Sequence, residues 1–134
     1  MNKKETAITD ISSRGDIEKV LSSFYQQAFT DDLIGTFFTE VVPLHLPTHL
    51  PLIADFWESV LFGTQGYRKN VMAVHQHIHN LAKIKKEHLD RWVQLFTQTV
   101  DELFAGEKAT LMKQRAVSIA TRMNIKLNHN SIDK

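Results

Sequence analysis

Apolar residues recur every three or four positions in several parts of this chain, and that spacing constrains its fold more than any other feature. The segments around residues 17–28, 89–104 and 112–123 each carry one continuous apolar stripe, as a helix with one buried face does. No segment of useful length alternates apolar and polar residues in the manner of a β-strand. The sequence therefore predicts an all-α fold without internal repeats.

Capping residues, prolines and glycines predict where the helices begin and end. Ser13, with an acidic residue three positions later, is typical of a helix start. Thr48 is expected to cap a further helix, with Pro51 tolerated because it falls in the first turn. Gly106 is expected to separate the last two helices, of which the second runs over about residues 107–127.

The length of 134 residues leaves room for one domain with a single core. We expect a frayed or disordered N-terminus over residues 1–13, a globular domain over 14–128 and a short tail over 129–134. The N-terminal residues include no apolar run of the kind found in a signal peptide or a membrane span, which predicts a cytoplasmic protein. The exposed ends of the predicted helices show no apolar patch of the kind that forms a subunit interface, so a monomer is expected.

Charge and cysteine content argue against several kinds of site. Sixteen Lys and Arg against fifteen Asp and Glu leave a net charge of +1, which gives no reason to expect nucleic-acid or membrane binding. The chain has no cysteine, which excludes disulfides, thiolate metal ligands and covalently attached c-type haem. It also lacks the sequence motifs of P-loop, dinucleotide-binding, zinc-protease, serine-hydrolase and di-iron proteins.

A histidine-rich segment over residues 67–79 carries His75, His77 and His79. If this segment is helical, an apolar wall surrounds His75, while His77 points roughly the other way; the wall consists of Val71, Met72 and Val74. A histidine on an apolar face can hold a haem iron, or it can be an ordinary hydrogen-bonded core residue. A His-x-His-x-His run is also compatible with a surface zinc or nickel site. The segment alone leaves these alternatives open.

Tyr25, His49, His75 and Trp92 come from different predicted helices and are candidates for one shared cavity. A haem needs a neutral imidazole on one side, apolar contacts across its faces and hydrogen-bond donors over the open position. The tyrosine hydroxyl and the indole N–H are donors of that kind. The alternative for Tyr25 and Trp92 is core packing with the polar group on a backbone carbonyl. For His49 it is an exposed histidine at a helix end.

The order of several short motifs resembles the group III truncated haemoglobins over about residues 15–127. The double-glycine motifs of groups I and II are absent, because Gly63 and Gly66 stand singly. The motifs that carry the resemblance are, in chain order, Phe24-Tyr25, Leu33-Ile34-Gly35-x-Phe37-Phe38, His49-Leu50-Pro51, Phe56-Trp57, Tyr67, His75, the run from His88 to Phe96, and Gln114-Arg115-Ala116.

This resemblance implies a truncated globin fold, which is a two-over-two helical sandwich around haem b, with His75 as the proximal iron ligand. It also implies that Tyr25 and Trp92 are distal hydrogen-bonding residues, that His49 lies at the distal gate and that Ile53 lines the same pocket. The other residues expected to contact the haem are Phe24, Phe38, Phe56, Trp57, Tyr67, Arg68 and Met72, of which Arg68 is a candidate partner for a propionate.

The expected function is reversible binding of dioxygen and other diatomic ligands at a polar distal site. Two donors favour redox or detoxification chemistry with nitric oxide, peroxide or nitrite over bulk oxygen transport. The residues do not distinguish nitric oxide dioxygenase from peroxidase-like activity, and the reductase that would re-reduce the iron is not identified. The alternative is a haem-free helical interaction or metal-binding module that uses His75, His77 and His79.

Overall fold

The computed structural model describes residues 8–36, 46–63 and 84–132, with the side chains of 46–49 and 127–132 excepted. Its helices are α1 (Arg14–Phe29), α2 (Leu46–Phe62), α4 (Lys86–Leu103) and α5 (Glu107–Ile132). Every regular element in the described ranges is helical, which confirms the all-α prediction. No helix in the described part of the chain is both long and apolar enough to cross a membrane.

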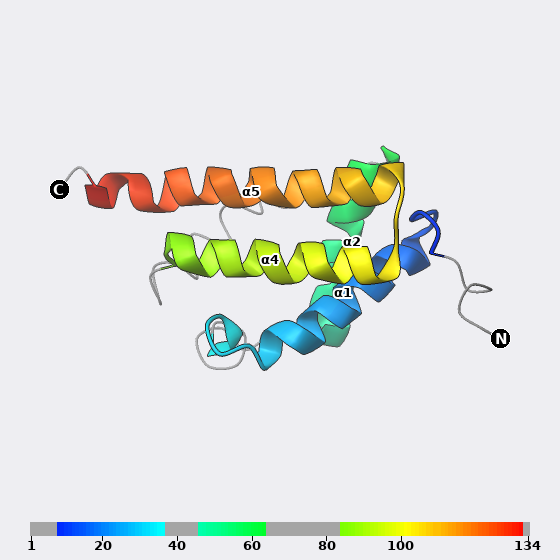
Figure 1. Cartoon of the computed structure of the whole chain (residues 1–134), viewed down its shortest axis with the longest axis horizontal. Coiled ribbons are helices and arrows are strands. Elements are labelled where there is room, and N and C mark those ends of the chain that lie inside the picture. The colour runs from blue at the N-terminus through cyan, green and yellow to red at the C-terminus, as the bar shows by residue number, and fades with distance from the viewer. Residues whose placement is uncertain (1–7, 37–45, 64–83, 133–134) are drawn as a thin grey trace.

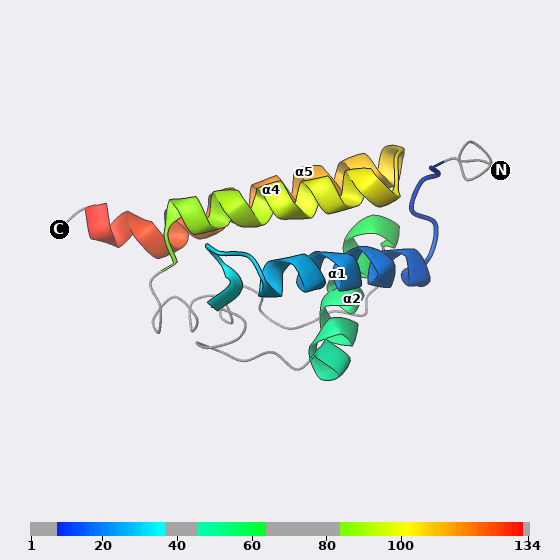
Figure 2. The same ribbon diagram turned by 60° about the horizontal axis from the view of Figure 1, so that its bottom comes forward.

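The four helices form two layers of two. Helices α4 and α5 lie antiparallel, side by side (Figure 1), and α1 and α2 cross one another in the other layer (Figure 2). Besides the contacts within each layer, α1 packs on α4 and α2 packs on α5. The predicted two-over-two arrangement is therefore observed, and the aromatic residues of three helices meet between the layers.

Helix α1 begins where the sequence predicts. Ser13 is its N-cap, and the serine side chain accepts a hydrogen bond from the backbone N–H of Asp16 at 3.3 Å. This bond satisfies one of the N–H groups that a helix start leaves without a partner. The stripe that α1 buries consists of Ile17, Val20, Leu21, Phe24, Tyr25 and Ala28. Helix α1 contributes more of the buried side chains of the main core than any other helix does.

Helix α2 begins earlier than the sequence suggests. It starts at Leu46, so Thr48 lies inside the helix and the prediction of Thr48 as its cap is wrong. Pro51 consequently falls in the second turn, where its missing N–H leaves the carbonyl of residue 47 without its intrahelical partner. The helix ends before Gly63, whose φ of +74° favours glycine.

The connection between α4 and α5 is fixed by the N-terminal segment. The carboxylate of Asp10 accepts hydrogen bonds from the backbone N–H groups of Lys108 and Ala109, both at 2.9 Å, and so caps α5. The carbonyl of Thr9 accepts a further bond from Ala105 N–H at 3.0 Å. Helix α5 then continues to Ile132, beyond the predicted end. Nothing in the sequence pattern predicts this contact between segments so far apart.

The buried residues form two clusters. The main cluster gathers side chains from α1, α2, α4 and the start of α5. A smaller cluster between the N-terminal half of α4 and the middle of α5 contains Ile84, Leu89, Ala120 and Met123. Trp92 packs against both clusters, so it sits where the two parts of the core join.

Candidate functional site

Phe24 of α1 is the centre of an aromatic cluster, by which we mean Phe24, Tyr25, Trp57, Trp92 and Phe96. Its ring centroid lies 5.1 Å from Tyr25, 6.3 Å from Trp92 and 5.4 Å from Phe96, each in an edge-on arrangement. Phe96 in turn stacks with Trp57 and with Trp92, with centroid distances of 5.4 and 5.5 Å. These are the geometries that aromatic pairs prefer, so the cluster fixes its members relative to one another.

Tyr25 and Trp92, the two predicted distal donors, are brought together by this cluster. Both contact the ring of Phe24, although they lie on different helices. Tyr25 is buried, and burial raises the pKa of its phenol above the ordinary value, which keeps the hydroxyl protonated at neutral pH. Trp92 is half-buried. The arrangement thus places a hydroxyl donor and an indole donor on two side chains that contact the same ring.

Several partly exposed apolar side chains pack against the same main core as these donors. Ile53 and Phe56 on α2 and Phe29 on α1 are half-buried and pack against the main core, as Trp92 does on α4. Phe56 also contacts Trp57, with centroids 5.2 Å apart. A flat apolar cofactor lying against such residues would cover surface that three helices leave partly open to water. The described part of the candidate site therefore fits a haem.

The predicted iron ligand and several predicted haem contacts lie outside the described residues. These are Phe38, Tyr67, Arg68, Met72 and His75, together with His77 and His79 of the histidine-rich segment. His49 belongs to α2, but its side chain is not among those described. The roles given to these residues stay predictions. Within the described ranges, no group of three or more His, Asp or Glu side chains is arranged to hold a metal ion.

An ion pair that the sequence did not suggest joins α1 to α4 beside the aromatic cluster. Asp31, just after α1, has a side chain that is only 5% exposed, and it pairs with Arg91, the neighbour of Trp92. The Arg91 guanidinium holds the pKa of the Asp31 carboxyl below its usual value. Burial raises the pKa, but the guanidinium and the hydrogen bonds from the backbone N–H groups of Leu33 and Ile34 together outweigh it. The pair therefore stays charged at neutral pH.

His88 lies one helical turn before Trp92 and caps the start of α4. Its Nδ1 accepts a hydrogen bond from the backbone N–H of Lys85 at 2.9 Å, which requires that nitrogen to be unprotonated. Burial is the largest effect and lowers the pKa of His88; the negative charge of Glu87 opposes it, and the charge of Lys85 makes a smaller contribution that lowers the pKa further. Neutral His88 is thus the form that the helix start favours.

A second link between helices holds α1 to α2 at the other end of α1. Arg14 donates to the carboxylates of Glu18 and Glu58, each at 3.0 Å, and also pairs with Asp55. Its guanidinium donates as well to the carbonyl of Pro51 at 3.0 Å. This network contains none of the aromatic cluster residues, so its role is to join the two helices.

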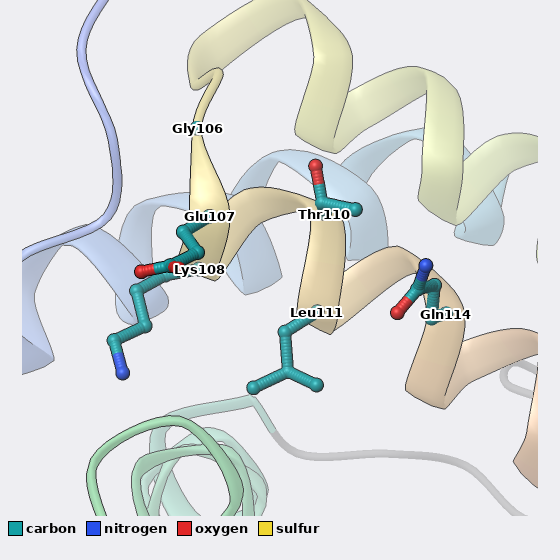
Figure 3. Close-up of a pocket in the computed structure, with 6 residues that line it drawn as sticks. All are labelled: Gly106, Glu107, Lys108, Thr110, Leu111 and Gln114. Atoms are coloured by element: carbon teal, nitrogen blue, oxygen red, sulfur yellow. The ribbon is translucent and has the colours of Figure 1, made fainter.

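An open cavity of about 790 Å³ lies at the N-terminal end of α5. Figure 3 shows Lys108 and Leu111 directed toward the neighbouring helix, with Thr110 on the other side of α5. The Lys108 ammonium donates to the carbonyl of Leu61 at 2.8 Å, so its charge already has a partner. The lining residues are Gly106, Glu107, Lys108, Thr110, Leu111 and Gln114. None belongs to the aromatic cluster, and we assign this cavity no role.

Comparison with known proteins agrees with the resemblance predicted from the sequence. No protein-family model matches the chain. A relative named group 3 truncated hemoglobin ctb, from Campylobacter jejuni subsp. jejuni serotype O:2, is 25% identical over 108 residues, which cover 78% of this chain and 83% of the relative. The crystal structure of the group III truncated hemoglobin from Campylobacter jejuni matches with a TM-score of 0.77 and 22% identity.

That structural match covers 90% of this chain and 95% of the other chain. The predicted resemblance to group III truncated haemoglobins is therefore confirmed, and the fold is the truncated globin fold.

Proposed function

We propose that this chain is a haem protein that reversibly binds dioxygen and other diatomic ligands. The observation that carries the proposal is the contact of both Tyr25 and Trp92 with Phe24, which gathers two hydrogen-bond donors beside partly exposed apolar residues. The truncated globin fold and the relative named as a truncated hemoglobin support the same reading. Haem b is the cofactor we expect, because a chain without cysteine must hold its haem non-covalently.

We assign the proximal iron ligand to His75 on the grounds of the apolar residues around it in the sequence and of the family resemblance. Arg68 is proposed to pair with a haem propionate. His49 is placed at the distal gate, and Ile53 beside the ligand. Bound haem would supply the iron centre at which diatomic ligands bind and accept or donate electrons.

On the distal side, the chain's own residues orient and retain the ligand. The Tyr25 hydroxyl and the Trp92 indole N–H would each donate a hydrogen bond to the polar end of a diatomic molecule. Burial raises the pKa of the Tyr25 phenol further above the neutral range, so the hydroxyl keeps its proton there. Phe24 contacts both of these rings, and Phe96 stacks on that of Trp92.

Two donors at one ligand make escape slow, which suits redox or detoxification chemistry better than oxygen transport. We therefore propose chemistry with nitric oxide, peroxide or nitrite, and a separate reductase that returns the iron to its ferrous state. Turnover of each oxidant in the presence of an electron donor distinguishes a nitric oxide dioxygenase from a peroxidase-like enzyme and from a simple carrier.

The proposal is tested by adding haemin to the purified chain and recording the Soret band. We expect an intense band in the wild type that is weakened or shifted in His75→Ala and retained in the matched variants His77→Ala and His79→Ala. A band that is unchanged in His75→Ala and lost in His79→Ala would move the ligand one turn along the chain. Failure of the wild type to bind haemin would contradict the proposed function and favour the haem-free alternative.

A further inference from the structure

We infer that the Asp31–Arg91 ion pair is a positioning device that sets where Trp92 lies relative to Tyr25. This inference rests on the proposed function, in which these two side chains contact the ligand. It assigns a role to two charged residues that touch neither the ligand nor the haem in the proposed site.

The carboxylate of Asp31 is held from two directions. Its Oδ2 accepts hydrogen bonds from the backbone N–H groups of Leu33 at 3.0 Å and Ile34 at 3.1 Å. Its Oδ1 lies 2.8 Å from Nε and 2.6 Å from Nη2 of Arg91. With four N–H donors on one nearly buried group, the position of the carboxylate is fixed, and so is the direction from which the guanidinium can approach.

The turn that carries Asp31 is rigidly attached to α1. A Cβ added at Gly35 would lie 2.7 Å from the carbonyl oxygen of Phe29, so the turn packs against the helix end without space to shift. Ile34, inside the turn, is buried in the main core. Tyr25 lies one helical turn before Phe29, with ring centroids 6.2 Å apart. Any displacement of Asp31 therefore requires the Tyr25 end of α1 to move as well.

On the other side of the pair, Arg91 directly precedes Trp92 in α4. Arg91 also donates to Gln94 Oε1 at 2.9 Å, which holds the guanidinium along its own helix. The ion pair thus joins the part of α1 that carries Tyr25 to the part of α4 that carries Trp92. The contacts of Phe24 also hold these two parts together. Ring packing provides the Phe24 contacts, whereas charge and directional hydrogen bonds provide the ion pair.

Burial distinguishes this pair from an ordinary surface pair. The neighbouring pair of Lys86 and Asp90 is exposed, with side chains 70% and 64% accessible, and such pairs have little effect on structure. Asp31 is 5% exposed, so removing Arg91 would leave a nearly buried carboxylate without its countercharge. The expected response is a shift of the turn or of the start of α4, and Trp92 would move with it.

The experiment measures the dioxygen dissociation rate of the haem-loaded protein for Arg91→Gln, Arg91→Lys and Asp31→Asn. We expect dioxygen to dissociate severalfold faster from Arg91→Gln and from Asp31→Asn than from the wild type. Arg91→Lys should have an intermediate rate, because lysine restores the charge but not the two-point contact. The exposed variant Asp90→Asn controls for loss of an ion pair on the same helix. Arg14→Gln, which loosens α1 from α2, controls for loss of stability alone; both controls should keep the wild-type rate.

A second measurement separates positioning from a general structural role. In a Trp92→Phe background, Arg91→Gln should produce no further change, because the donor that the pair positions is already gone. The inference would be overturned if Arg91→Gln changed the dissociation rate equally in the wild type and in the Trp92→Phe variant. It would also be overturned if Arg14→Gln changed the rate as much as Arg91→Gln does. If Trp92→Phe alone accelerates dissociation while Arg91→Gln does not, only the inference fails. If Trp92→Phe has no effect, the proposed distal role of Trp92 fails, and the inference with it.

Discussion

The ring of Trp57 stacks on that of Phe96, with centroids 5.4 Å apart and planes inclined by 18°. The two residues belong to α2 and α4, which are in opposite layers and whose backbones do not pack directly on each other. The stack therefore spans the molecule from one layer to the other. Phe96 also stacks on the ring of Trp92, another member of the aromatic cluster.

Replacing Trp57 by alanine should destabilise the fold severely. Trp57 is only 3% exposed, and truncating a buried tryptophan costs about 3–5 kcal/mol, because burial is lost and a cavity remains. Urea unfolding followed by circular dichroism measures the loss. Val117→Ala, at an exposed apolar position of α5, is the matched control and should change stability little. Equal midpoints for the two variants would show that the stack contributes nothing beyond surface packing.

Tyr25→Phe should speed dioxygen dissociation from the haem-loaded protein severalfold. The substitution removes the hydroxyl donor but keeps the ring, so its edge-on contact with Phe24 at 5.1 Å is retained. Laser photolysis or stopped-flow mixing measures the rate. Lys86→Gln, at an exposed position of α4, should leave it unchanged. Identical rates for Tyr25→Phe and the wild type would remove Tyr25 from the role proposed for it.

Gly106→Ala should destabilise the protein more than Gly63→Ala. Both glycines have a positive φ, +145° and +74°, where a side chain is strained by about 1–3 kcal/mol. At Gly106 an added Cβ would also lie 2.5 Å from the carboxyl carbon of Asp10, whereas at Gly63 it meets nothing within 4 Å. Thermal unfolding of the two variants measures the difference. A larger loss in Gly63→Ala would contradict the placement of Asp10 over the α4–α5 connection.

His88 should make the stability of α4 depend on pH. Its folded-state pKa lies below the ordinary value of 6.5, so on acidification the unfolded chain takes up its proton first. Stability is therefore complete above pH 6.5 and decreases as the pH falls from there through the folded pKa. His88→Gln retains a side chain that can accept the Lys85 N–H bond but does not titrate. Unfolding midpoints between pH 7 and 5 should fall more steeply in the wild type than in this variant.

Local patterns predicted the parts of the fold that depend on neighbours in the chain. The single apolar stripe and the Ser13 cap located α1, because both are properties of consecutive residues. The start of α2 was misplaced because a proline usually marks a helix end or first turn, whereas here Pro51 lies in the second turn of the helix. The pairs of Arg91 with Asp31 and of Arg14 with Asp55 join residues 60 and 41 positions apart. No spacing rule marks such contacts before the helices are packed.

For the candidate site, the sequence indicated which residues can donate hydrogen bonds, and the structure showed which side chains they contact. Donor chemistry and the family resemblance singled out Tyr25 and Trp92, but only the packing shows that Phe24 contacts both. Phe96 was expected to be a core residue, and its position between two tryptophans could not be read from its place in a stripe. Asp31 carried no local signal, since an acidic residue after a helix is common and usually exposed to solvent.

The hydrogen bonds of Asp10 to Lys108 and Ala109 connect positions that are 98 and 99 residues apart. During synthesis, the acceptor leaves the ribosome long before its donors exist, so this contact forms only after nearly the whole chain has emerged. The bond to Ala109 joins the most widely separated pair among the hydrogen bonds of the described residues, and it ties the segment before α1 to the start of α5. A protein shortened by its first ten residues would lack this cap, and the backbone N–H groups of Lys108 and Ala109 would lose their carboxylate acceptor.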